Sequence, residues 1–199
     1  MSIASPATGA WLPPPEEIFR ITVEQYEEWS GSGSIGEEDR VELLDGVIVR
    51  KMTKNPPHLL CCDLCRDELT RILPPGFWLR GESPVRIAPV SMPEPDLIVL
   101  RGSPRDLASR LPLPSDVVLC VEVADSSLAR DRGVKRDLYA RAGISNYWLV
   151  NLTERRVEVF ADPKDGAYAT ASVAGETGSV GLVVDGEAWG RVEVAAILP

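Results

Sequence analysis

The sequence lacks a long apolar run, a recognisable secretory signal and any internal repeat. No hydrophobic segment approaches the ~20 residues that a membrane-spanning helix needs, and no basic segment followed by an apolar stretch opens the chain. These absences argue against membrane insertion and secretion, so we expect a cytoplasmic protein. Of the 199 residues, 44% are hydrophobic and 26% are charged. These ordinary globular values exclude collagenous and wholly disordered proteins.

A chain of this length predicts one folded domain with extensions, because a span near ~150 residues is typical of a single domain. Residues 1–15 are rich in proline, serine and alanine and predict a loose leader. The single domain is expected over residues 16–199, with its core at about residues 40–161.

Basic residues are few relative to acidic ones, 21 against 30, which gives a formal net charge of −9. The first 48 residues hold ten of these acids and only two bases, so residues 49–199 are nearly neutral. Proteins that bind nucleic acid usually carry a basic face. Only residues 127–143 are locally basic, with five Arg or Lys residues against two Asp residues. The charge therefore gives weak support for a DNA partner.

Histidine occurs once, as His58, and cysteine four times, as Cys61, Cys62, Cys65 and Cys120. The C-C-x-x-C cluster suggests metal or redox chemistry, but the chain offers no second pair of ligands for a structural zinc site. The three clustered cysteines also follow the spacing of an amphipathic helix, where thiols behave as small hydrophobes. We therefore expect reduced cysteines, with at least two of the three packed against the sheet.

Local patterns predict strands that alternate with helices. Helices are expected over residues 23–29, 58–73 and 131–142, a hairpin over 40–50 around Asp45-Gly46, strands over 77–80, 85–88, 96–100, 117–123, 147–151 and 155–160, and a β-rich tail after about residue 162. This order indicates an α/β or α+β sheet with helices on its faces.

Three acidic residues lie where charges are unusual. Glu122 stands near the end of the β-branched run 117–123, Asp96 opens a strand directly after Pro95, and Glu42 lies in an otherwise apolar strand. Carboxylates in such places need a partner. We expect the carboxylates of Asp96 and Glu122 to lie within about 6 Å of each other, close enough to share one Mg²⁺ or Mn²⁺ ion, and Glu42 to face the same cleft.

A lysine on the following helix completes the pattern. Lys135 lies four residues from both Asp131 and Tyr139, on a helix that follows the strand ending at Glu122. We expect its ammonium group within about 5 Å of Glu122 or Asp96. On a cleft wall it should contribute little to folding while it orients a water molecule or a phosphate. Acids and a lysine around a metal are typical of phosphodiester hydrolysis.

Each of these residues also has a structural interpretation. Glu122 could pair with an arginine, Asp96 could serve as a turn residue, and Lys135 could be a solvated helix lysine. Glu42 could form a salt bridge within the hairpin, and His58 could cap the helix that follows it.

Several motifs, in this order, resemble the Uma-two family of restriction-endonuclease-like proteins, a branch of the PD-(D/E)XK nuclease superfamily. They are ELLDG at 42–46, PDL at 95–97, VEV at 121–123, D-x-G-x-K-x-x-x-Y-A-x-A-G at 131–143 and YWLV at 147–150. The resemblance covers roughly residues 20–161. It implies a restriction-endonuclease-like mixed sheet flanked by helices, and a divalent-metal site built from the matching acids.

Within this resemblance, Asp96 matches the aspartate of the PD motif and Glu122 matches the acid of the (D/E)XK motif. Position 124 is alanine where the superfamily has lysine. The Uma-two branch places its lysine on the next helix, and Lys135 matches it. Glu42 matches an acid of the hairpin that precedes the first core helix, and it would be a further metal or water ligand.

The resemblance implies a metal-dependent endonuclease that hydrolyses phosphodiester bonds in DNA with Mg²⁺ or Mn²⁺ as cofactor. His58 stands where this branch often has a histidine, which makes it a peripheral site candidate. A homodimer is expected by analogy with nucleases that cut two strands. Two other functions stay open, a catalytically silent nuclease-fold protein that binds or scaffolds a partner, and a non-nuclease metal hydrolase.

Overall fold

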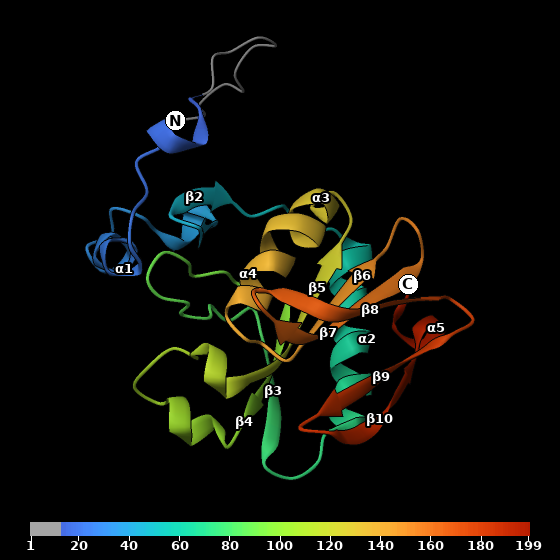
Figure 1. Ribbon diagram of the computed structural model, residues 1–199. Helices are drawn as coiled ribbons and strands as arrows, with labels where there is room; N and C mark the ends of the chain where they lie inside the picture. Colours follow the sequence, from blue (N-terminus) through green and yellow to red (C-terminus); the bar gives the residue numbers. More distant parts are fainter. Residues whose placement is uncertain (1–12) are drawn as a thin grey trace.

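A six-stranded mixed sheet forms the centre of the protein (Figure 1). The computed structural model describes residues 13–199, so most of the predicted leader, residues 1–12, lies outside the described residues. In spatial order the strands are β3 (Phe77–Gly81), β4 (Leu97–Arg101), β5 (Val117–Ala124), β6 (Asn146–Asn151), β7 (Arg156–Lys164) and β8 (Ala167–Gly175). Only β5 and β6 run parallel; the other neighbours are antiparallel.

Helices cover both faces of this sheet, as the sequence predicts. The long helix α2 (Pro56–Ile72) packs on one face, next to the hairpin of β9 (Ser179–Val184) and β10 (Glu187–Glu193) and the short helix α5 (Val194–Ile197). The other face is covered by α3 (Leu128–Arg130), a π-helix η5 (Asp131–Lys135) and α4 (Arg136–Arg141).

Strand β5 contributes side chains to both layers. Val121 and Val123 pack toward α2, whereas Cys120 and Ala124 pack toward α4. Because side chains alternate along a strand, Glu122 shares the α4 face with Cys120 and Ala124. A carboxylate is thereby buried in the middle of the molecule, opposite the π-helix.

The helix α2 begins where the sequence places two prolines. The side chain of Asn55 caps it by accepting a hydrogen bond from the backbone N–H of His58, 3.0 Å away, and proline suits the first helical turn because no intrahelical donor is lost there. Cys61, Cys65 and Leu69 recur every four residues and form its buried stripe. All four cysteines are buried and form no disulfide, and Cys61, Cys62 and Cys65 pack in the core between α2 and the sheet, which confirms the predicted packing.

The hairpin of β1 (Val41–Leu44) and β2 (Val47–Arg50) lies beside the main sheet. Asp45 and Gly46 adopt φ values of 46° and 78°, as a two-residue turn between antiparallel strands requires. Backbone hydrogen bonds between Leu43 and Met92 and the ion pair of Arg141 with Asp45 hold the hairpin in place. Helix α1 (Val23–Gly31) packs against the hairpin from the outside.

Two predicted elements differ from the structure. Residues 85–88 form no strand; only Ile87 makes an isolated bridge, with Ser91, because Pro84 and Pro89 flank the segment and remove ladder donors. The helix predicted over residues 131–142 begins earlier, at Leu128, and contains the π-helix. The connections between these elements contain short 3-10 helices, namely η1 (Pro15–Glu17), η2 (Glu37–Asp39), η3 (Pro104–Leu107) and η4 (Pro114–Asp116). Over residues 13–199, no helix combines the length and apolarity needed to span a membrane.

The packing of α2 gives a stability test. Leu69 is 1% exposed in the core between α2 and the sheet, so Leu69→Ala should lower the free energy of unfolding by about 3 kcal/mol. Leu60, on the same helix, is 48% exposed, and Leu60→Ala should change the free energy of unfolding by less than about 0.5 kcal/mol. Urea unfolding followed by circular dichroism measures both. Equal effects at the two positions would contradict the packing described for α2.

Candidate metal and nuclease site

A cavity of about 420 Å³ opens where the β1–β2 hairpin, the start of α2, the end of β5 and the π-helix meet. It brings together all five residues singled out in the sequence, namely Glu42, His58, Asp96, Glu122 and Lys135, and adds Asp131. Each of the six is at most 9% exposed. These residues come from five separate segments, so the fold concentrates charge at one buried place.

Lys135 lies at the centre of the acid cluster. Its Nζ donates to Glu122 Oε1 at 2.9 Å and lies 3.0 Å from Glu42 Oε2. The predicted contact between Lys135 and Glu122 is therefore confirmed. The hydroxyl of Tyr139, one turn further along, donates to the same oxygen of Glu122 at 2.7 Å. Two donors thus fix the orientation of the Glu122 carboxylate.

The burial of Lys135 corrects one expectation. The sequence suggested a lysine on a cleft wall that contributes little to folding, but Lys135 is only 3% exposed and is paired with two buried carboxylates. Removing one partner of a buried ion pair leaves an uncompensated charge in a poorly solvated place. Lys135 is therefore part of the structural core as well as part of the site.

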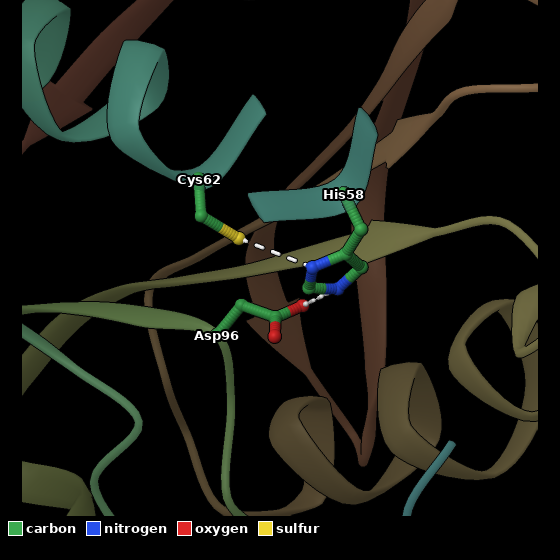
Figure 2. Close-up of side chains that lie close together, drawn as sticks. All are labelled: His58, Cys62 and Asp96. Carbon is green, nitrogen blue, oxygen red and sulfur yellow. Dashed lines mark hydrogen bonds and ion pairs between the residues drawn. The ribbon is translucent and has the colours of Figure 1, made fainter. Parts of the chain in front are cut away.

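Asp96 lies at the start of β4 and reaches the backbone of β5. Its Oδ2 lies 3.2 Å from His58 Nε2 (Figure 2). The same oxygen accepts the N–H of Val123 at 2.8 Å, and Lys54 Nζ is 3.0 Å from Oδ1. Burial opposes ionisation, but His58, Lys54 and the Val123 N–H together lower the pKa of Asp96 to about 2. Since Glu122 directly precedes Val123, the two acids lie around the same point of the β4–β5 pair.

The net shift of the pKa is in the opposite direction at Glu122, because burial outweighs the nearby positive charge there. Loss of solvation raises the pKa of Glu122 well above its usual range, and the nearby carboxylates add to this, although Lys135 opposes it. Burial alone would lower the pKa of Lys135, but the carboxylates of Glu122, Glu42 and Asp131 outweigh it and raise that pKa. The lysine therefore stays charged, and the acids around it compete for one buried cation.

Asp131 is a site residue that the sequence analysis did not select. It is 2% exposed, and its Oδ1 has no hydrogen-bond partner among residues 13–199; the same holds for Glu42 Oε1. Arg130 Nε lies 3.8 Å from the first oxygen and 3.9 Å from the second, too far for a hydrogen bond to either. The four-residue spacing from Asp131 to Lys135 was the available signal, because it places both on one side of the helix.

The residues around the cavity fit a hard divalent cation. Four buried carboxylates, Glu42, Asp96, Glu122 and Asp131, supply oxygen atoms, the ligands that Mg²⁺ and Mn²⁺ prefer. Two of those oxygens are buried without a hydrogen-bond partner in the described chain and have Arg130 nearby, whereas buried polar atoms normally have such a partner. The donor set and the unpartnered oxygens both favour a metal at this place.

The π-helix that carries Asp131 and Lys135 is anchored to the sheet. Arg132 donates from Nε to Glu158 Oε2 on β7 at 3.0 Å, and its second nitrogen contacts Glu158 Oε1. Burial would raise the pKa of Glu158, but Arg132 and Arg156 outweigh it and lower that pKa. This pair fixes the segment from outside the cavity.

Comparison with known proteins identifies the family. A family model for Uma2, described as "Putative restriction endonuclease", matches residues 23–193. The chain belongs to the Uma2 family. This confirms the resemblance seen in the sequence motifs. A search of curated proteins found no match.

A solved structure shows the same fold as this Uma2 family member. It is the crystal structure titled "a putative nuclease belonging to DUF820 from Anabaena variabilis", with a TM-score of 0.67 and 16% identity over 89% of this chain and 97% of that one. The predicted restriction-endonuclease-like mixed sheet is thereby confirmed. At this identity the likeness concerns the fold only.

Lys135 gives a stability prediction for this Uma2 family member. Lys135→Met keeps most of the length of the side chain but leaves Glu42 and Glu122 buried without their cation, so it should lower the free energy of unfolding by about 3 kcal/mol at pH 7. The control is Arg136→Met on the next, partly exposed residue, which should cost less than about 1 kcal/mol. Urea unfolding in EDTA measures both. A Lys135→Met protein as stable as the control would rule out the buried ion pair.

Glu158 gives a prediction on pH dependence. Its pKa is lowered in the folded protein, so the interaction stabilises the fold above the unfolded-state pKa of about 4.3 and is lost as pH falls through the folded-state pKa. Glu158→Gln should therefore cost about 1 kcal/mol at pH 7, since its arginine partners are partly solvated. That difference from wild type should shrink below about pH 4. Urea midpoints measured from pH 3 to pH 7 test this; a constant difference would contradict it.

Proposed function

We propose that this chain is a metal-dependent nuclease that hydrolyses phosphodiester bonds in DNA at the cavity described above. The observation that carries the proposal is the group of four buried carboxylates that line the cavity with Lys135, two of them with an oxygen that has no hydrogen-bond partner among residues 13–199. A purely structural cluster would be expected to satisfy those oxygens. Membership of the Uma2 family supports a nuclease; the metal and the choice of DNA are part of the proposal.

Asp96, Glu122 and Glu42 would hold a Mg²⁺ or Mn²⁺ ion, with Asp131 beside them. Such an ion, when bound, supplies an activated water and neutralises charge on the phosphate. The protein's own contribution is to keep the acids in place. Tyr139 fixes one oxygen of Glu122, and the Val123 N–H fixes one oxygen of Asp96.

Lys135 has two tasks in this proposal. In the absence of substrate its ammonium holds Glu42 and Glu122 together. When a phosphate enters, the same group is close enough to the acids to orient the attacking water or to stabilise charge that develops on the phosphate oxygens. Arg40, Lys51 and Lys54 line the outer part of the cavity and would contact the DNA backbone.

An alternative function, a catalytically silent binding protein, has one observation in its favour. Nine acidic residues line the cavity against five Lys or Arg residues. A surface of that sign repels phosphate unless cations neutralise it. The alternative therefore predicts neither cleavage nor any metal binding that depends on the central acids.

Supercoiled plasmid DNA is the substrate for the test, with Mg²⁺ or Mn²⁺ present and EDTA as the metal-free reference. Wild type should convert it to nicked or linear DNA only with the metal. Asp96→Asn and Glu122→Gln should each slow this by about 10²-fold or more, the scale of losing one transition-state charge partner. Glu154→Gln, outside the residues that line the cavity, is the control and should cleave as wild type does.

Parallel assays separate the alternatives. RNA and a small phosphodiester should be cleaved more slowly than DNA if DNA is the substrate. Calorimetric titration with Mn²⁺ should show binding that Glu122→Gln weakens. Folded wild-type protein that neither cleaves DNA nor binds Mn²⁺ would reject the proposal and leave the silent binding protein.

A further inference from the structure

A second group of potential metal ligands adjoins the cavity on the side of α2. The imidazole of His58 lies between two other groups: its Nδ1 is 3.6 Å from Cys62 Sγ, and its Nε2 is 3.2 Å from Asp96 Oδ2 (Figure 2). One donor atom from each residue can be chosen so that all three lie within 4.8 Å of one another. The proposed hydrolysis uses neither Cys62 nor His58.

We propose that Cys62, His58 and Asp96 form a binding site for a thiophilic divalent ion of the zinc class. A thiolate, an imidazole and a carboxylate together suit Zn²⁺, whereas Mg²⁺ prefers oxygen ligands alone. This site differs in its ligands from the proposed oxygen-ligand site of Asp96, Glu122 and Glu42, and the two sites share Asp96.

The spacing of sulfur and nitrogen supports direct coordination. Zn–S bonds of about 2.3 Å and Zn–N bonds of about 2.0–2.1 Å at a tetrahedral ion place the two donors about 3.5 Å apart. The observed separation of Cys62 Sγ and His58 Nδ1 is 3.6 Å. His58 and Cys62 are one helical turn apart on α2, so the rigid helix sets this spacing and the pair is already arranged for an ion.

Asp96 would be the third ligand, and the cavity gives the ion a route to the site. His58 and Asp96 both line it, which gives an ion from solvent a path to the buried sulfur. Binding replaces the thiol proton: the sulfur–hydrogen bond breaks, a sulfur–metal bond forms, and the proton leaves to solvent. Water would complete the coordination, as is common for zinc with three protein ligands.

One neighbouring group opposes the ion. Lys54 Nζ lies 3.0 Å from Asp96 Oδ1 and 3.3 Å from Glu82 Oε1. Its side chain is 22% exposed, so it can turn toward solvent when the ion arrives. Removing this charge should tighten metal binding.

Sharing of Asp96 has a regulatory consequence, which rests on the proposed function. An ion held by Cys62 and His58 would take an Asp96 oxygen away from the Mg²⁺ or Mn²⁺ ion of the nuclease site. The two ions would then compete by linkage, each weakening the other. Zinc would inhibit cleavage, and high Mg²⁺ would relieve the inhibition.

Cobalt titration tests the site without any nuclease assay. Co²⁺ bound to a thiolate in tetrahedral geometry gives charge-transfer and ligand-field absorption that Zn²⁺ then removes by displacement. We expect one equivalent of Co²⁺ to produce this spectrum in reduced wild-type protein and in Cys61→Ser, which alters the neighbouring buried thiol. Cys62→Ser should lose the thiolate band, and Lys54→Met should bind Co²⁺ several-fold more tightly.

A second variant covers a failure of Cys62→Ser to fold. His58→Gln keeps the thiol and should weaken Co²⁺ binding by about tenfold or more. Absence of a thiolate band in wild type, or an equal band in wild type and folded Cys62→Ser, would overturn the proposal. So would unchanged Co²⁺ affinity in His58→Gln.

The cleavage assay then tests the consequence separately. Zinc should inhibit Mg²⁺-dependent cleavage by wild type, and Cys62→Ser should cleave at the wild-type rate with its zinc sensitivity reduced about tenfold or more. Equal inhibition of both proteins would overturn the regulatory role of the site. A wild-type protein that cleaves nothing would reject the proposed function instead, while the cobalt spectrum would still decide on the metal site.

Discussion

The ion pairs of Lys135 connect the parts of the molecule that form the cavity. Its single ammonium group bridges Glu42 of the β1–β2 hairpin and Glu122 of β5, and it comes from the π-helix on the face of the sheet. Three elements distant in sequence therefore meet at one buried cation. Burying two carboxylates is unfavourable unless a cation lies close to both, so the position of the hairpin and that of the π-helix depend on the same contact.

This arrangement also explains the electrostatic character of the site. Among the cavity-lining Lys and Arg residues of the described chain, Lys135 is almost fully buried, whereas the side chains of Lys54 and Arg130 are more than 20% exposed. Four buried acids thus exceed the buried positive charge. A divalent cation would correct the excess, which links the stability of the apo protein to its proposed cofactor through mass action.

Much of the fold followed from local sequence patterns. The β-branched run that became β5, the Asp45-Gly46 turn and the proline-led helix α2 each carry their own structural signal, so their positions were predictable. Glu122 lies in the otherwise apolar strand β5, so the sequence alone indicated that its buried carboxylate needs a partner. The motif order indicated where that partner lies, and Lys135 does contact Glu122.

Other features depend on tertiary contacts that no local pattern reports. The burial of Lys135 follows from two acids on separate elements. The spacing of Asp131 and Lys135 is readable in the sequence, but the burial of Asp131 in the cavity is not. The segment before Ser91 has alternating residues like a strand, yet with Pro84 and Pro89 on either side it forms only one isolated bridge, between Ile87 and Ser91. The sequence analysis did not predict the contact of Cys62 with His58, although the two lie four residues apart on α2. The proximity of both to Asp96 requires the packing of α2 on the sheet.

The π-helix has a consequence for how this segment can vary in length. Lys135 lies 13 residues after Glu122 and contacts it. The π-helix between Asp131 and Lys135 has a wider turn than an α-helix, and this turn directs the Lys135 side chain to Glu122. Deleting one residue from an α-helical segment rotates everything after it by about 100°, which would turn Lys135 away from Glu122 without altering any charge in the sequence. Substitution of an exposed residue such as Val134 leaves that geometry unchanged. The number of residues between Glu122 and Lys135 is thus itself a structural constraint. The segment between them should tolerate substitutions of exposed residues far better than insertions or deletions.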